Sequence, residues 1–327
     1  MQRAFVTGGS GFIGSGLVRA LRARGVAVCA LARSPRAAAH VEGLGAEPVF
    51  GDLENPAALA KGMQGCDVVF HAAANLSDWD LDADLRINVK GTELVLRTAV
   101  SAQVARVVYV SGTGVLIGSG PVVDASEDLP CGKPVGALSA SRVRSETTVR
   151  AGNGAQLETV VVRLPYVWGP GDTLRPQLRA ALRAGQYFWI SRGDHLISTC
   201  HIDNAVAGLL AAAEHGRPGA LYHLADGAPL KLRTFITEQM RVEGLVLPDR
   251  SIPFWVAKVM ADGLFALSRV FRVTPAWLAL SPTFVRFLGQ QITIDDSCAR
   301  RELGYRPTID WQTGLSQLIP HHLENVT

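Results

Sequence analysis

Apolar runs of strand length alternate with helix-like segments along the first half of the chain. The runs Arg3–Thr7, Ala27–Ala32 and Asp67–Ala74 consist largely of small and apolar residues, the pattern of strands that are buried on both faces. Between the first two runs, residues 15–24 carry apolar side chains at the spacing of one helix face, and Gly25 follows where that helix would end. This alternation predicts an α/β fold with a doubly wound parallel sheet and helices on both faces.

Three glycines lie where the first strand meets the first helix. Gly8 allows a tight turn, Gly11 lets the backbone approach a pyrophosphate, and Gly14 permits close packing of the helix on the strand. Phosphates bind well at such a helix N-terminus. The motif therefore predicts a Rossmann-like dinucleotide site, and we assign to it the residues Gly8, Gly9, Ser10, Gly11, Phe12, Ile13 and Gly14.

The end of the second strand indicates which dinucleotide binds. Strands that prefer NAD end in an acid for the ribose hydroxyls, whereas this one is followed by Arg33, Ser34 and Arg36. The Arg33 guanidinium can form two charge-assisted bonds to a 2′-phosphate, with Ser34 and Arg36 in reach. The sequence therefore favours NADP(H) as the cofactor. The alternative is that these arginines are ordinary solvated surface charges.

Two later strand ends complete the cofactor site that the pattern predicts. Asp52 and Leu53 follow a short strand and fit the adenine edge. The small residues Ala72, Ala73 and Ala74 end the next strand, where they leave room for the cofactor.

The same pattern suggests two domains. Regular alternation up to about residue 170 predicts a dinucleotide-binding domain, 1–170, to which a strand and a helix from about 195–225 are added. Residues 171–327 are expected to form mainly a smaller C-terminal substrate-binding lobe with a lid. The segment 252–271 is apolar at helical spacing, but its charged residues interrupt every run long enough to span a membrane. Aromatic residues of this lobe either line the lid or pack the lobe, namely Phe188, Trp189, Phe254, Trp255, Trp277 and Phe284.

Five motifs occur in the order found in one enzyme family. They are Asn88–Thr92, Val107–Thr113, Arg163–Asp172, His201–Asn204 and Leu303–Pro307, and they span nearly the whole chain. The chain thus resembles the extended short-chain dehydrogenases/reductases, and most closely the branch of 3β-hydroxysteroid dehydrogenases, dihydroflavonol reductases and NAD-dependent epimerase/dehydratases. The resemblance implies a Ser/Thr, Tyr and Lys triad beside the nicotinamide. It also implies further cofactor contacts from Ser111, Arg142, Leu164, Pro165 and Val167.

The triad is incomplete in this sequence. Where the family has Tyr-x-x-x-Lys, the chain has Leu138 and Arg142, and no tyrosine lies between residues 110 and 165. Leu138 has no proton to donate, and a guanidinium does not act as an acid near neutral pH. Arg142 can still bind the nicotinamide ribose and supply positive charge. Thr113 occupies the place of the catalytic Ser or Thr, where its hydroxyl can stabilise negative charge on a carbonyl oxygen. We assign Thr113 and Arg142 as the catalytic residues.

Further residues are expected to contact the substrate. They are Ser77, Trp79, Thr113, Leu138, Tyr166 and Tyr187. Asp78 lies on the same loop, but the ordinary pKa of a carboxyl group, near 4, argues against it as a proton donor. For Tyr166 a packing role is an equal alternative. Because no well-placed acid is found, we expect the substrate to supply the proton itself, from a phenol beside the ketone.

Composition excludes several other functions. The net charge of +3 is spread over 32 basic and 29 acidic side chains, so a nucleic-acid partner is not expected. The five cysteines lack metal-ligand spacing, so no metal is expected and the thiols are interpreted as reduced. The first strand begins at once, which leaves no room for a targeting segment and predicts a cytoplasmic protein. We expect it to be a monomer or a homodimer.

These observations favour an NADPH-dependent ketoreductase that acts on a bulky aromatic or polyketide-like ketone in specialised (antibiotic) biosynthesis. The resemblance to this branch suggests an activity similar to that of the angucyclinone 7-ketoreductases. A non-catalytic NADP-binding sensor or scaffold is the alternative from a different class. A sugar-nucleotide epimerase/dehydratase is less favoured, because the resemblance implies that those enzymes need the tyrosine as a base.

Overall fold

A computed structural model describes residues 1–271 and 280–319 of the 327-residue chain. Its centre is a parallel seven-stranded sheet with the strand order β12-β7-β5-β4-β1-β2-β3. The strands are β1 (Arg3–Thr7), β2 (Ala27–Ala32), β3 (Glu47–Phe50), β4 (Val68–His71), β5 (Arg106–Gly112), β7 (Glu158–Leu164) and β12 (Leu221–His223). The predicted doubly wound sheet is therefore confirmed.

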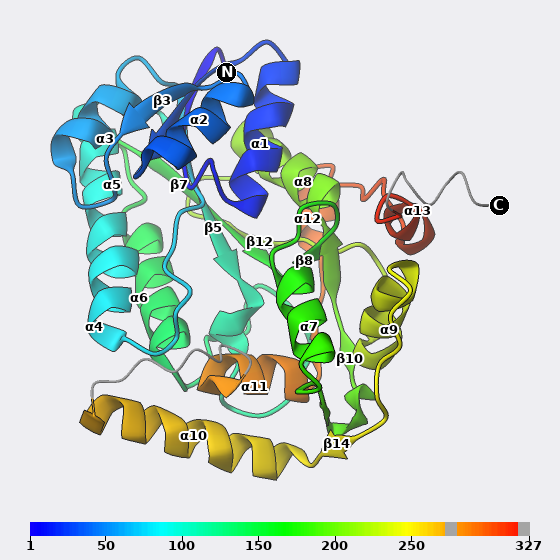
Figure 1. Ribbon diagram of the computed structural model, residues 1–327. Coiled ribbons are helices and arrows are strands. Elements are labelled where there is room, and N and C mark those ends of the chain that lie inside the picture. Colours follow the sequence, from blue (N-terminus) through cyan, green and yellow to red (C-terminus); the bar gives the residue numbers. More distant parts are fainter. Residues whose placement is uncertain (272–279, 320–327) are drawn as a thin grey trace.

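Helices cover both faces of this sheet (Figure 1). One face carries α1 (Phe12–Ala23), α2 (Pro35–Gly43), α8 (Ile202–His215) and, beside β12, the short α12 (Ser297–Glu302). The other face carries α3 (Pro56–Met63), α5 (Gly91–Ser101) and α6 (Ala137–Ala151). Because side chains alternate along a strand, β1 sends Val6 to the first face and Phe5 to the second, and both are fully buried.

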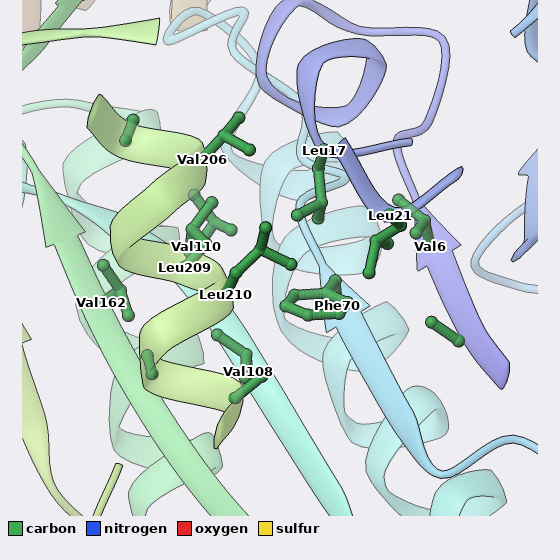
Figure 2. Packing of buried hydrophobic residues seen from close by; sticks show 14 of the residues in the cluster. Val6, Leu17, Leu21, Phe70, Val108, Val110, Val162, Val206, Leu209 and Leu210 are labelled. Carbon is green, nitrogen blue, oxygen red and sulfur yellow. The ribbon is translucent and has the colours of Figure 1, made fainter. Parts of the chain in front are cut away.

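The first of these two core layers is shown in Figure 2. Leu209 and Leu210 of α8 pack toward Val108 on β5, and Leu21 of α1 lies near Val6 on β1. Burying a Leu or Val side chain contributes about 1.5–3 kcal/mol. The helix formed by residues 202–215 thus packs against the central sheet of the nucleotide-binding half.

A second sheet lies in the smaller lobe. Its strands are β13 (Leu230–Lys231), β10 (Leu196–Ile197), β15 (Ile292–Ile294) and β6 (Val122–Ala125). Two further strand pairs are β8 (Tyr166–Trp168) with β11 (Thr199–His201), and β9 (Trp189–Ile190) with β14 (Ser251–Ile252). The lobe helices are α7 (Leu174–Arg183), α9 (Leu232–Val242), α10 (Phe254–Phe271), α11 (Pro282–Gly289) and α13 (Trp311–Ser316).

The lobe sheet differs from the expected division of the chain in one respect. Residues 122–125 fall within the 1–170 segment that we assigned to the nucleotide-binding domain, yet β6 pairs with β15 in the second sheet through Val122 and Ile292. Val122 is buried there in an apolar cluster with Ile292 and Ile294. The excursion between β5 and α6 therefore belongs structurally to both halves.

The remaining short elements lie near the carboxyl ends of the central strands or in the lobe. They are α4 (Leu81–Asp84), a π-helical turn η1 (Leu85–Lys90), and the 3₁₀ turns η2 (Thr113–Leu116) and η3 (Ser191–Gly193). The 18-residue α10 is the longest helix, and no described helix combines the length and apolarity that crossing a bilayer requires.

Candidate active site

The glycine motif forms a tight cradle at the start of α1. Gly8 has φ +74°, and a Cβ there would lie 2.7 Å from the backbone nitrogen of Ala73. A Cβ on Gly14 would lie 2.0 Å from the carbonyl oxygen of Gly8. The first turn of α1 has no acidic residue and no side-chain cap. Its N–H groups therefore lack a side-chain partner and form the positive end of the helix dipole. The cradle fits the diphosphate of a dinucleotide.

Arg33, Ser34 and Arg36 lie together between the end of β2 and the first turn of α2. Both guanidiniums are exposed and make no hydrogen bond within the described part of the chain. Ser34 caps α2, because its hydroxyl oxygen accepts a bond of 3.2 Å from the Ala37 backbone. The arginines are thus available to an anionic group that binds beside the cradle.

The adenine-edge residues differ in exposure. Asp52 is exposed, and its carboxylate accepts a bond of 2.9 Å from the Glu54 backbone. Leu53 is buried against Gly91, where an added Cβ would lie only 2.9 Å from the Leu53 Cβ. Leu53 therefore packs the core beneath this edge, and Asp52 is the residue of the two that faces solvent.

The end of β4 is held by a buried histidine that the sequence analysis did not single out. His71 bonds through Nδ1 to the Thr7 hydroxyl at 2.7 Å and through Nε2 to the Thr92 hydroxyl at 2.9 Å. Thr92 donates its own proton to the Asn88 carbonyl, so His71 Nε2 carries the hydrogen and Nδ1 accepts. Burial, with the nearby charge of Arg142, lowers the pKa of His71 to about 3. This neutral histidine fixes the strand whose end carries Ala72, Ala73 and Ala74, all half-buried beside the cradle.

Ser111 is tied to a buried ion pair. Its hydroxyl donates to Glu146 Oε2 at 2.8 Å, and Arg163 Nε donates to the same oxygen at 3.0 Å. Both charged side chains are almost fully buried, and Arg163 also lies 3.4 Å from His223 Nε2. The ion pair joins α6 to β7. The Ser111 hydroxyl already uses its proton in the bond to Glu146.

The next strand end contributes the other residues that we assigned to the cofactor. Leu164 and Pro165 are buried at the end of β7, and Val167 is half-buried on β8. These three side chains form an apolar wall beside the carboxyl edge of the sheet.

The structure brings the two proposed catalytic residues to this edge. Thr113 begins η2 directly after β5; it is 1% exposed, and its Oγ1 makes no hydrogen bond within the described residues. Arg142, on α6, donates a bond of 3.0 Å to the Val110 carbonyl of β5, and its charge reaches His71 and Tyr109. Leu138 is buried one turn before Arg142. A buried hydroxyl without a partner calls for an explanation, and a bound molecule that accepts its proton is one.

Asp78 holds the first turn of α6 in place. This fully buried residue has φ +58°, and its carboxylate accepts bonds of 2.8 Å from the Leu138 backbone and 2.7 Å from the Thr283 hydroxyl. The Thr283 backbone N–H donates to its other oxygen at 2.8 Å. Two helix N-termini, those of α6 and α11, thus converge on one carboxylate. Asp78 is a structural anchor here, in keeping with our decision to discount it as an acid.

Ser77 and Trp79 flank Asp78 on the loop formed by residues 75–80. Ser77 is half-buried and donates to Asp84 Oδ1 at 3.3 Å. Trp79 is 6% exposed, packs toward Phe265 of α10 with ring centroids 6.4 Å apart, and has an indole N–H without a partner in the described residues. Asp84 was not among our expected site residues, because nothing in its sequence context distinguishes it from a surface helix acid.

Tyr166 and Tyr187 lie in the apolar core of the lobe. The Tyr166 ring packs edge-on against Phe235 at 5.1 Å and stacks on Phe287, and burial raises its pKa well above the usual value. Tyr187 packs edge-on against Trp189 at 5.1 Å, and burial raises its pKa as well. Both phenols are therefore firmly protonated, and the Tyr166 ring has the packing role that we gave as its alternative.

The aromatic residues of the expected lid fall into three groups. Trp189 is buried in the lobe core, and Phe188, Phe254 and Phe284 are half-buried. Trp255 is 68% exposed on the outer face of α10, so it does not line an enclosed site. Trp277 lies outside the described residues.

Comparison with known proteins identifies the family of the chain. The model of the NAD dependent epimerase/dehydratase family matches residues 4–225. The chain is 43% identical to the 4-hydroxy-2-methyl-3-oxo-4-farnesyl-3,4-dihydroquinoline-1-oxide ketoreductase of Stigmatella aurantiaca over 97% of this chain and 96% of that protein. It is 32% identical to a 2-alkyl-3-oxoalkanoate reductase of Stenotrophomonas maltophilia over 97% and 98% of the two chains.

A solved structure agrees with these relatives. The dTDP-glucose 4,6-dehydratase DesIV of Streptomyces venezuelae, as a double mutant with NAD and DAU bound, superposes with a TM-score of 0.78 at 25% identity, covering 99% of this chain and 98% of that one. The fold, the glycine cradle and the relatives in sequence all indicate the same family. The chain is an oxidoreductase-type member of the NAD dependent epimerase/dehydratase family, with the fold of the extended short-chain dehydrogenases/reductases.

Proposed function

We propose that the protein is an NADPH-dependent ketoreductase that reduces one ketone of a bulky aromatic, polyketide-like substrate in specialised (antibiotic) biosynthesis. The observation that carries this proposal is the buried Thr113 hydroxyl, which has no partner in the described residues and lies at the carboxyl edge of the sheet. The similarity to a ketoreductase over nearly the full length of both chains supports it.

The residues of the cradle fit the cofactor by chemistry and shape. When bound, the nicotinamide dinucleotide supplies the hydride. Gly8, Gly11 and Gly14 leave room for its diphosphate at the N-terminus of α1. Arg33 and Arg36 bind a 2′-phosphate, which makes NADPH the preferred form. Arg142 retains free N–H donors for the ribose hydroxyls after its bond to Val110.

Thr113 stabilises charge on the substrate. Its hydroxyl donates a hydrogen bond to the ketone oxygen, which becomes an alkoxide as the hydride arrives. Because the group is buried and already positioned, this bond strengthens as negative charge develops. Leu138 contributes shape only, beside Trp79 and Ser77 on the opposite loop.

The proton comes from the substrate. Thr113 is too weak an acid, Leu138 has no proton, and Arg142 keeps its charge. A phenol next to the ketone would hand its proton over within the bound molecule, where the effective concentration is very high.

A matched pair of ketones tests the proton source. Anthraquinones that carry a hydroxyl beside one ketone are compared with the methyl ethers of the same compounds, with NADPH consumption followed by absorbance. We expect the hydroxyl compounds to be reduced at least 100-fold faster at equal binding, since general acid catalysis contributes about that much. Equal rates for both would assign the proton to an enzyme group instead.

A non-catalytic NADP-binding sensor is the second candidate, and the leucine at position 138 favours it. That candidate predicts tight NADPH binding with no ketone reduced. Calorimetric titration of NADPH, run beside the absorbance assay, distinguishes the two functions.

A further inference from the structure

A buried carboxyl group beside the candidate active site has no role in the mechanism above. Asp84 ends α4 and is 0% exposed. Its Oδ1 accepts bonds from the Asn75 side-chain amide and, at 3.3 Å, from the Ser77 hydroxyl. Its Oδ2 is buried and has no hydrogen-bond partner in the described residues. A buried carboxyl oxygen left without a partner is costly, so it requires an explanation.

Hydrogen bonds connect this carboxyl to the loop that holds Leu138. Ser77, which donates to Asp84 Oδ1, precedes Asp78 on the 75–80 loop, and Asp78 accepts a bond of 2.8 Å from the Leu138 backbone N–H. The same loop follows β4, and the neighbouring strand β5 leads directly into Thr113. Ser77 therefore lies one residue from the anchor of the Leu138 end of α6.

A polar network fixes Asp84 in this place. Asn88, in the π-helical turn that follows Asp84, bonds both backbone groups of Asn75 and the Ser141 hydroxyl of α6. Such π-helical turns occur frequently at functional sites. Ser77 is half-buried and Asp84 fully buried, so Ser77 is the member of the pair that a substrate can reach.

The surroundings of Asp84 make it easier to protonate than an ordinary carboxyl group. Burial raises its pKa to about 6, the charge of Asp78 adds to that rise, and hydrogen bonds from Asn75, Ser77 and the Asp78 backbone oppose it. Among the described residues, the α6 side chains that bond to this network are two uncharged hydroxyls. Ser141 accepts a bond from the Asn88 amide, and Ser145 donates one to the Asn88 carbonyl. About a tenth of the molecules are then protonated at pH 7, against roughly one in a thousand for an ordinary carboxyl group.

We propose that Ser77 and Asp84 form a proton relay that returns a proton to the substrate after reduction. The proposal rests on the proposed function, in which the substrate hydroxyl gives its proton to the former ketone oxygen. The Ser77 hydroxyl then donates its proton to the substrate oxyanion, and Asp84 donates its proton to Ser77 Oγ. Once the product has left, the half-buried Ser77 hydroxyl passes a proton from solvent back to the buried Asp84 carboxylate, which closes the cycle without any change of oxidation state.

Stopped-flow kinetics of Asp84→Asn test the relay. The amide keeps the shape of the side chain but has no proton to transfer. We expect an initial burst that consumes about one NADPH per active site, followed by turnover about 100-fold slower than in the unmutated enzyme. Asp82→Asn, which changes an exposed acid on the same helix, is the matched control and should show normal turnover. Slow turnover without a burst would overturn the relay, because Asp84 would then act at or before the hydride step.

Ser77→Ala removes the relay but keeps the Asp84 carboxyl group. It therefore tests the relay even if Asp84→Asn fails to fold. We expect kcat of the unmutated enzyme to fall as pH rises through about 6, because the acid form of Asp84 is required. This pH dependence should disappear in Ser77→Ala. If it persists together with normal kcat, the relay is wrong while ketone reduction itself stands. Absence of NADPH consumption by the unmutated enzyme would instead contradict the proposed function.

Infrared spectroscopy provides a readout that needs neither cofactor nor turnover. The carbonyl stretching band of protonated carboxyl groups is followed as pH is raised. Asp172, whose pKa burial also raises to about 6, contributes to this band, so the difference between the unmutated protein and Asp84→Asn isolates Asp84. We expect that difference to vanish with a midpoint near pH 6. A midpoint near 4, the ordinary value, would overturn the proposal.

Discussion

A buried hydroxyl without a hydrogen-bond partner costs about 1–3 kcal/mol of folding free energy, and within the described residues Thr113 has such a hydroxyl at the carboxyl edge of the sheet. The protein tolerates this cost beside Leu138, a residue without chemistry of its own. The loss of the phenol at position 138 was readable from the sequence, because the surrounding motifs fix the register. The unpartnered state of Thr113 was not, since it depends on which atoms of distant segments approach it.

The first prediction at the residue scale concerns Leu138. If this side chain only shapes the pocket, Leu138→Ala should change turnover by no more than a few-fold. Arg142→Ala should instead raise the dissociation constant of the cofactor, because it removes donors to the ribose. Steady-state kinetics and cofactor titration measure the two effects. A large loss of turnover in a normally folded Leu138→Ala variant would contradict the role given to this side chain.

The second prediction concerns the cofactor. NADPH should bind at least tenfold more tightly than NADH, which corresponds to roughly 1.4 kcal/mol for a guanidinium–phosphate pair. Arg33→Ala should remove most of that preference. Arg19→Ala, at an exposed arginine within α1, is the control and should leave it intact. Equal affinities of the unmutated protein for both cofactors would refute the role given to Arg33.

At the scale of elements, the 75–80 loop organises the site. It joins β4 to α4 and, through Asp78, holds the N-termini of α6 and α11. The sequence placed this loop after a strand and marked Ser77 and Trp79 as candidates, because loops at the carboxyl ends of parallel strands line binding sites. It did not reveal the contact with Thr283, which is 205 residues further along the chain. Local patterns carry no information about such distant partners.

Gly136 tests this arrangement. A Cβ at Gly136 would lie 2.3 Å from Asp78 Oδ1, and that oxygen is held by two hydrogen bonds. Gly136→Ala should therefore lower the free energy of unfolding by about 2 kcal/mol, the usual cost of overpacking. Gly154→Ala is the matched control, because an added Cβ there meets no atom within 4 Å. Chemical denaturation measures both variants, and equal stabilities would show that Asp78 does not fix the start of α6.

For the molecule as a whole, the parallel sheet and the presence of a smaller C-terminal lobe followed from the sequence, whereas the strand pairing within the lobe did not. Strand-length apolar runs and the glycine cradle are local signals, so the parallel sheet and its first crossover were predictable. The pairing of β6 with β15 joins residues about 170 positions apart, and no turn or spacing announces it. The same limit applies to Asp84, whose burial arises from α6 and the 75–80 loop closing over one short helix.

The most direct test of the proposed ketoreductase activity is to measure ketone reduction by the unmutated protein and by its Thr113→Val variant. Purified protein, NADPH and a panel of aromatic ketones with a neighbouring hydroxyl are combined, nicotinamide absorbance is followed, and the alcohol product is identified by mass spectrometry. We expect at least one ketone to be reduced, and Thr113→Val to lower its kcat by about 10- to 1000-fold with little change in NADPH binding, because one donor to the developing oxyanion is lost. Tight NADPH binding with no ketone reduced, or an unchanged kcat in Thr113→Val, would contradict the account.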